Sequence, residues 1–154
     1  MQAINTQSTA NAAWMEHRIL DHIKQALRVT LDWKVPSVGV HQKLSSMQFT
    51  LKSFQRHLDR LMNLEERDGY MVLVMETKPN LCCRVERLAE DHQRFRESIE
   101  QLIPEIESLC EFQNEQFEDI CQQINDLLDR VDHHDEQEVE LLQEAFLDDE
   151  GGEG

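Results

Sequence analysis

The chain has 154 residues, of which 40% are hydrophobic, and 31 acidic residues against 15 basic ones give a formal net charge of −16. This length fits one domain that buries its own core without disulfide support. The excess of negative charge repels nucleic acid and anionic lipid, which excludes both as expected partners and leaves cations as attractive ligands.

The composition favours helices and a cytoplasmic protein. Five glycines and three prolines are few for this length, and Glu, Leu, Gln and Arg are abundant, as in helical proteins. No apolar run approaches the roughly 20 residues of a membrane span, and the N-terminal segment lacks the features of a signal peptide. The four cysteines form no CxxC pair, so we expect reduced side chains in the cytoplasm.

The first predicted helix spans about residues 10–33 and follows a flexible polar tail at residues 1–9. Apolar residues recur along it at the spacing of one helix face. The segment KVPSVGV then interrupts the pattern, because Pro36 and Gly39 both disfavour continuation of a helix.

A second helix is predicted after this break. Its apolar seam advances in alternating steps of three and four residues, as in the helices of a bundle. The pattern continues to about Met75, and the segment Lys78–Asn80 closes it. The inward positions of this seam are Leu44, Met47, Leu51, Phe54, Leu58 and Leu61, followed by Glu65.

Two further seams of the same kind predict a third and a fourth helix. The third seam consists of Leu81, Val85, Leu88, His92, Phe95, Ile99 and Leu102. The fourth consists of Phe117, Ile120, Ile124, Leu127, Val131, His134, Glu138, Leu141 and Ala145. Pro104 predicts a kink or break near the end of the third helix. Together the helices predict an all-α, up-down-up-down four-helix bundle over residues 10–146, with an acidic disordered tail at residues 147–154.

Ionisable residues occupy seam positions where a hydrophobic residue is due. They are Glu65 and His92 on the second and third helices, and His134 and Glu138 one turn apart on the fourth. A buried charge needs a partner, because removing it from water is costly. A cation would serve, and carboxylate with imidazole suits iron, manganese or zinc. The neighbouring polar residues expected to face water are His133, Asp135, Glu136 and Glu140.

The depth of these residues in the bundle is estimated by counting along each helix at about 1.5 Å per residue. Glu65, His92 and Glu138 then lie at similar depth. The first helix offers His17 and His22. His17 fits the depth of Glu65 better and is favoured, whereas His22 lies on the cleaner apolar stripe, so both are candidates.

Four segments resemble the helices of hemerythrin-like (HHE cation-binding) domains, in the order of that family. LDRVDHHDEQEVELLQEAF resembles the last helix and includes His134 and Glu138, and AEDHQRFRESIEQL resembles the third and includes His92. MEHRILDHIKQAL is similar to the first helix and favours His17, while LMNLEERDGYM resembles the second and keeps Glu65. The resemblance spans about residues 13–150 and implies a bundle that holds non-haem iron, with a role in oxygen, iron or nitric-oxide sensing or storage.

The chain departs from the family pattern on the second helix, where Leu61 stands in the place of the family's histidine. The third helix also has a single histidine, whereas respiratory hemerythrins carry two there. Glu66 is an alternative to Glu65 as a ligand. The candidate residues could hold one metal, or two metals with water in the gaps, or they could form a polar core without metal. The candidate ligands are His17, Glu65, His92, His134 and Glu138.

Two functional hypotheses follow from these features. The first is a small cytoplasmic hemerythrin-like protein with iron as cofactor and dioxygen or another small diatomic as ligand. The second is a degenerate, metal-poor bundle that acts as an interaction or structural module. An enzymatic role is disfavoured, because a Glu-x-x-His pair on two helices is not found. Nucleophile constellations and phosphate-binding glycine loops are also absent from the sequence.

Overall fold

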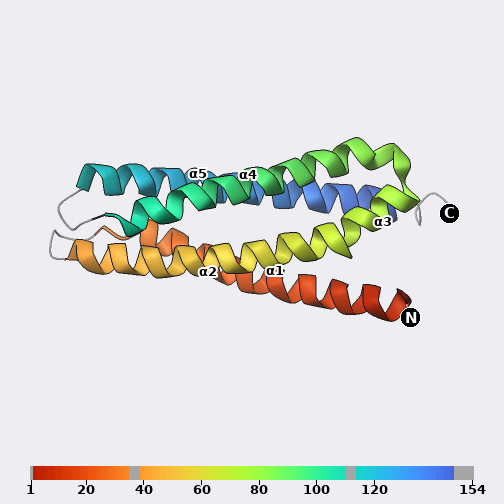
Figure 1. Cartoon of the computed structure of the whole chain (residues 1–154), viewed down its shortest axis with the longest axis horizontal. Coiled ribbons are helices and arrows are strands. Elements are labelled where there is room, and N and C mark those ends of the chain that lie inside the picture. The colour runs from red at the N-terminus through yellow and green to blue at the C-terminus, as the bar shows by residue number, and fades with distance from the viewer. Residues whose placement is uncertain (1, 35–38, 110–113, 148–154) are drawn as a thin grey trace.

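The computed structural model of the protein describes residues 2–34, 39–109 and 114–147, and these form an all-α bundle (Figure 1). Its long helices are α1 (Gln2–Asp32), α2 (Val40–Arg67), α4 (Cys82–Glu107) and α5 (Asn114–Leu142). Shorter elements are α3 (Tyr70–Thr77), the 3-10 turn η2 (Pro79–Leu81) and the π-helical turn η3 (Gln143–Leu147). Successive long helices run antiparallel (Figure 1), so the predicted four-helix bundle is confirmed.

The ends of the bundle differ from the predicted boundaries. Helix α1 begins at Gln2, before the predicted start near residue 10. The segment QAINTQSTANAA contains neither glycine nor proline, so nothing in it opposes helix extension. At the other end, η3 reaches Leu147, and the rest of the predicted acidic tail lies outside the described residues.

The prediction of one continuous second helix up to Met75 is wrong, because the chain turns at Asp68 and Gly69 and begins the separate helix α3. The apolar period continues across this turn, which is why the sequence pattern conceals it. A Cβ atom at Gly69 would lie 2.6 Å from the carbonyl oxygen of Leu64 and 2.7 Å from Cα of Glu65. Only glycine therefore fits this corner, which sets the position of Tyr70 beside Glu65.

Pro104 lies inside α4 and does not end it, since the helix continues to Glu107. A proline this close to the C-terminus removes one hydrogen bond in the last turns and still leaves its own carbonyl available. The backbone N–H of Ser108 donates to that carbonyl oxygen at 3.0 Å. Of the predicted kink or break at this position, the break is therefore wrong.

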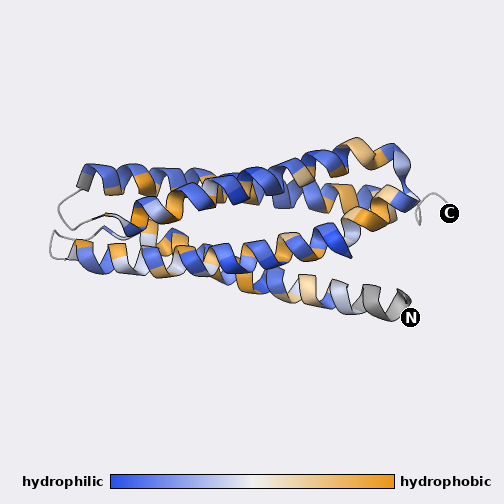
Figure 2. Cartoon of the chain, viewed as in Figure 1, coloured by the Kyte–Doolittle hydropathy of each residue, from blue (hydrophilic) through white to orange (hydrophobic). Residues whose placement is uncertain are grey.

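Apolar side chains form two core clusters rather than one. The larger joins α1, α2, α4 and α5 and includes Leu27, Phe54, Leu61 and Leu127. The smaller joins α3, α4 and α5 around Val74, Leu88 and Leu141, and Figure 2 shows α3 as a largely hydrophobic segment. A layer of buried ionisable residues separates the two clusters. None of the helices in the described ranges is both long and apolar enough to cross a membrane.

Candidate metal centre

All four long helices contribute an ionisable side chain to the layer between the two apolar clusters. The structure brings together the five predicted residues: His17 from α1, Glu65 from α2, His92 from α4, and His134 and Glu138 from α5. Four of them are buried, with 1–4% of each residue exposed. His17 is the exception, since 36% of its side chain is exposed.

Short distances connect these side chains across the bundle. His92 Nε2 lies 3.2 Å from His134 Nε2 and 3.5 Å from Glu65 Oε1. The other oxygen of Glu65 lies 3.6 Å from His17 Nε2, and Glu138 Oε2 lies 3.3 Å from His134 Nε2. Glu65 therefore faces an imidazole on each side. Potential ligand atoms of His17, Glu65 and Glu138 all lie within 4.8 Å of one another.

The orientation of the two buried imidazoles is set from outside the cluster. His134 Nδ1 lies 3.0 Å from Asp91 Oδ2, so its N–H donates to that carboxylate. Burial lowers the pKa of His134, but the neighbouring carboxylates Glu138 and Asp91 outweigh it and raise that pKa. In the neutral form of the ring, Nε2 presents a lone pair toward His92. Burial and the charge of His134 lower the pKa of His92 to about 4, which leaves His92 neutral at pH 7. Either a proton or a metal ion between the rings makes this close approach favourable.

The two buried carboxylates cannot both be ionised cheaply in this layer. Burial, together with hydrogen bonding and the negative charge of Glu138, raises the pKa of Glu65 well above its usual range. Burial opposes ionisation of Glu138 too, but a hydrogen bond from Glu65 and the neighbouring imidazole of His134 outweigh it and lower the pKa of Glu138. The metal-free pair therefore holds one proton, on Glu65, which a bound cation would displace.

Within the described residues, three buried side-chain polar atoms have no hydrogen-bond partner, and all three lie at this layer. They are Tyr70 Oη, His92 Nδ1 and Glu138 Oε2. The nearest carboxylate to His92 Nδ1 is Glu66, at 3.5 Å and outside hydrogen-bond geometry. Buried polar groups are normally paired, so unpaired ones at a single place indicate a missing ligand, ion or water.

The structure distinguishes the alternatives that the sequence left open. His22 is exposed, whereas His17 faces Glu65. Glu66 lies on the outer side of His92 and is paired with Arg96, whose Nη1 donates to Glu66 Oε1 at 3.0 Å. Burial alone would raise the pKa of Glu66, but the hydrogen bond and charge of Arg96 outweigh it and lower that pKa. His17 and Glu65 are thus the residues placed to act as ligands.

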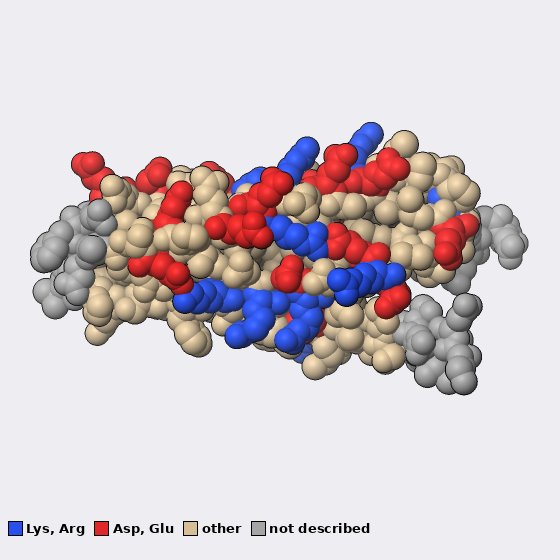
Figure 3. Space-filling view, viewed as in Figure 1, with Lys and Arg blue, Asp and Glu red and all other residues tan. Residues whose placement is uncertain are grey.

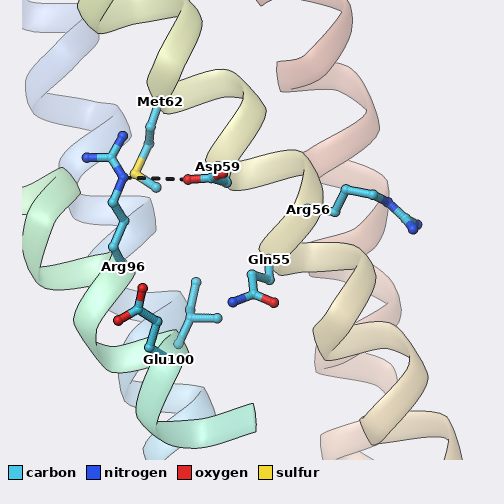
Figure 4. Close-up of a pocket in the computed structure, with 7 residues that line it drawn as sticks. Gln55, Arg56, Asp59, Met62, Arg96 and Glu100 are labelled. Atoms are coloured by element: carbon cyan, nitrogen blue, oxygen red, sulfur yellow. Dashed lines mark ion pairs between the residues drawn. The ribbon is translucent and has the colours of Figure 1, made fainter.

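Arg96 also borders a separate hollow of about 260 Å³ between α2 and α4, shown in Figure 4. In that view Arg96 points toward Asp59, and its Nε lies 3.5 Å from Asp59 Oδ1. The guanidinium is therefore paired with two carboxylates, those of Asp59 and Glu66. This hollow has no convergent ligand set and is distinct from the buried layer.

The apolar side chain of Leu61 closes one side of the layer. Leu61 is 2% exposed and belongs to the larger apolar cluster. The nearest imidazole on α2, His57, is engaged elsewhere: its Nδ1 lies 2.8 Å from Glu16 Oε2. Arg60 Nη1 donates to the other oxygen of Glu16 at 3.0 Å. Neither His57 nor Glu16 therefore adds a ligand to the layer.

No protein-family model matches this chain, and no curated protein or solved structure matches it either. The case for a metal centre thus rests on the geometry of the described residues together with the motifs of the sequence.

Four residues near the site were missed at the sequence level. Asp91 orients His134, and Tyr70 places its hydroxyl in the layer. Asp135, predicted to face water, is half-buried and accepts a hydrogen bond from the buried Lys24 at 3.1 Å. Lys24 also donates to Asp132 at 2.8 Å. Asp91 directly precedes His92 in the sequence, but its partner lies on another helix, so periodicity along one helix could not reveal the contact.

Proposed function

We propose that this chain is a hemerythrin-like protein that binds non-haem iron, or another divalent metal, between the two apolar clusters. The observation that carries the proposal is the convergence of imidazole and carboxylate groups from four helices at a layer with three unpaired polar atoms. Such an arrangement is costly without a ligand and favourable with a cation.

The donor set suits such a metal. His92 and His134 would supply buried imidazole nitrogens. Glu65 and Glu138 would supply carboxylate oxygens, and these lie between the two buried imidazoles and that of His17. Mixed imidazole and carboxylate ligands suit iron, manganese and zinc. Bound iron would supply a centre for dioxygen or another small diatomic, in keeping with sensing or storage in the cytoplasm. The remaining residues would orient the ligands and exclude water.

The surface supports a small ligand rather than nucleic acid as the partner. The net charge is −16, which repels polyanions. On the face shown in Figure 3, Lys and Arg side chains form one short band across the lower middle, and Asp and Glu side chains border it.

A second candidate function is a metal-free helical module. It is favoured by Leu61, which fills with apolar packing the place where the family has a histidine. In this case the proton on Glu65 and a proton between His92 and His134 would form the hydrogen bonds that pair the buried polar groups of the layer. The module would then be structural, and its buried polar groups would serve only the specificity of packing.

The two functions are separated by loading the protein anaerobically with ferrous iron, removing excess metal and measuring iron per chain. The test variant is His134→Ala with Glu138→Ala. The matched control is His133→Ala with Glu140→Ala, which removes an exposed histidine and an exposed glutamate from the same helix. A metal protein retains iron in the wild type and the control and loses it in the test variant. A metal-free module retains none in any of the three.

A further inference from the structure

A large cavity connects the candidate metal centre to solvent. Its volume is about 840 Å³, and its walls come from α1, the end of α2, α3 and the end of α5. The inner end is formed by His17, Glu65 and Glu138, which also face the metal layer. Figure 1 shows the N-terminal part of α1 diverging from the rest of the bundle beside α3. The proposed metal would therefore be accessible from this side.

The size of the cavity does not match a diatomic ligand. A water-sized molecule occupies about 30 Å³, whereas pockets for organic ligands measure roughly 300–1,000 Å³. The cavity is in the second range, so it fits a molecule with an extended body.

The walls indicate that this body is apolar. Small side chains on α1, Ala10 and Ala13, leave the space open. Trp14, Leu73 and Leu142 supply apolar surface around it. Trp14 is 57% exposed and Leu73 is 39% exposed, so both would gain burial from an apolar ligand.

The inner end indicates the chemistry of the ligand's head. The hydroxyl of Tyr70 is buried and has no partner, although the residue lines the cavity. A phenol hydroxyl carries its proton at neutral pH, so Tyr70 can act as a hydrogen-bond donor toward a ligand. A bound cation would lie beside it. A head group with two acceptor oxygens, such as a carboxylate, can contact the cation with one oxygen and accept a hydrogen bond from the Tyr70 hydroxyl with the other.

The rim of the cavity carries the acidic residues Asp68 and Glu76 and one basic residue, Arg67. The net charge of the rim disfavours an anion, as does Glu138 at the inner end. A carboxylate is thus attracted only when the metal neutralises the inner end. Binding of the organic ligand should therefore depend on the metal.

We propose that this cavity binds a medium-chain carboxylic acid, with its carboxylate at the metal and the Tyr70 hydroxyl and its chain against Trp14, Leu73 and Leu142. This inference rests on the proposed function. It adds an organic ligand and assigns Tyr70 as the residue that recognises its head.

The experiment is a calorimetric titration of the metal-loaded full-length chain with acetate, hexanoate and octanoate, after iron per chain has been measured. Each added methylene should tighten binding by about two- to fourfold. Tyr70→Phe should weaken octanoate binding by roughly tenfold, because it removes one hydrogen bond to a charged group. Metal-free protein should show no binding.

A second variant tests the cavity without touching the metal layer. Ala10→Trp should fill the cavity and abolish octanoate binding while leaving acetate binding and iron content unchanged. Ala26→Trp introduces the same side chain at an exposed position elsewhere on α1 and should bind octanoate like the wild type. Melting curves of both variants establish that they are folded.

The outcomes separate this inference from the proposed function. Iron retention with no dependence of affinity on chain length overturns the inference and leaves the metal centre in place. The inference is equally overturned if octanoate binds as well to Ala10→Trp, or to metal-free protein, as to the loaded wild type. Failure to retain iron overturns the proposed function and the inference together.

Discussion

The Nε2 atoms of His92 and His134 face each other at 3.2 Å in the centre of a bundle that is otherwise held by apolar packing. These rings come from α4 and α5, and Glu65 and Glu138 flank them. The Nδ1–H of His134 is directed outward to Asp91. That contact leaves the inner nitrogen of His134 as an acceptor, which is the form a metal requires.

The pair should make the metal-free protein sensitive to acid through His92. Its pKa falls from the usual value of 6.5 to about 4 on folding, mainly because the ring is buried. Between pH 6.5 and pH 4 the unfolded chain therefore binds a proton at this position that the folded chain does not. The free energy of unfolding should fall over that range by up to about 3 kcal/mol from this group.

Urea denaturation at a series of pH values measures this dependence. His92→Gln should flatten the profile between pH 6.5 and pH 4, whereas His22→Gln, which changes an exposed histidine, should keep the wild-type slope. An unchanged slope in His92→Gln would show that His92 is protonated as easily in the folded chain as in the unfolded one.

Glu65→Gln should separate metal binding from stability. Glu65 holds the shared proton in the metal-free state, so a neutral amide of the same shape should change the free energy of unfolding by about 1 kcal/mol or less. The variant lacks the anionic oxygens that face His17 and His92, so metal affinity should fall at least 100-fold.

Glu100→Gln is the matched control for this substitution, because it changes an exposed carboxylate on α4 that lies outside the layer. Competition with a metal-binding dye measures both affinities. Equal losses in the two variants would argue against Glu65 as the ligand.

Asp91→Asn tests the outer contact to His134. An amide in this place accepts a weaker hydrogen bond and no longer stabilises a charged or metal-bound imidazole. Metal affinity should fall about 10- to 100-fold. Asp59→Asn, which changes a carboxylate paired with Arg96, should leave it unchanged. Spectroscopic titration with cobalt would measure both, and wild-type affinity in Asp91→Asn would remove Asp91 from the site.

Gly69→Ala should damage the fold at the corner between α2 and α3. The added methyl group would lie 2.6 Å from a backbone oxygen that cannot easily move, and overpacking of this kind costs about 1–3 kcal/mol. The shift would also displace Tyr70. Gly39→Ala is the control, because Gly39 has φ −91° and ψ −3°, which alanine adopts readily. Thermal melting compares the two, and equal melting temperatures would contradict the close approach.

Periodicity predicted most of the architecture and the inward ligand candidates, because both depend on which face of a helix a residue occupies. Glu65, His92, His134 and Glu138 replace apolar residues on regular seams, and all four are buried. The choice of His17 over His22 needed the depth count, since His22 lies on the cleaner apolar stripe. The exposure of His22 follows from how α1 packs against α2 and α5, and the apolar stripe alone does not determine that packing.

The missed features depend on contacts between distant segments. Asp135 seemed to face water because it follows His134 on the helix, but Lys24 reaches it from α1, more than 100 residues earlier. The turn at Gly69 was hidden because Met71 and Val74 continue the apolar period of α2. In both cases local pattern gave no information about the neighbouring helix.

The central claim is that the layer around His92 and His134 binds a metal in the native state. The most direct test is iron per chain and melting temperature, measured on the same anaerobically loaded sample and compared with metal-free protein. A ligand that binds only the folded chain must raise its stability, by about 4 kcal/mol at 1,000 times its dissociation constant. Stoichiometric iron with a raised melting temperature is the predicted result. Iron-free protein with an unchanged melting temperature would contradict the claim.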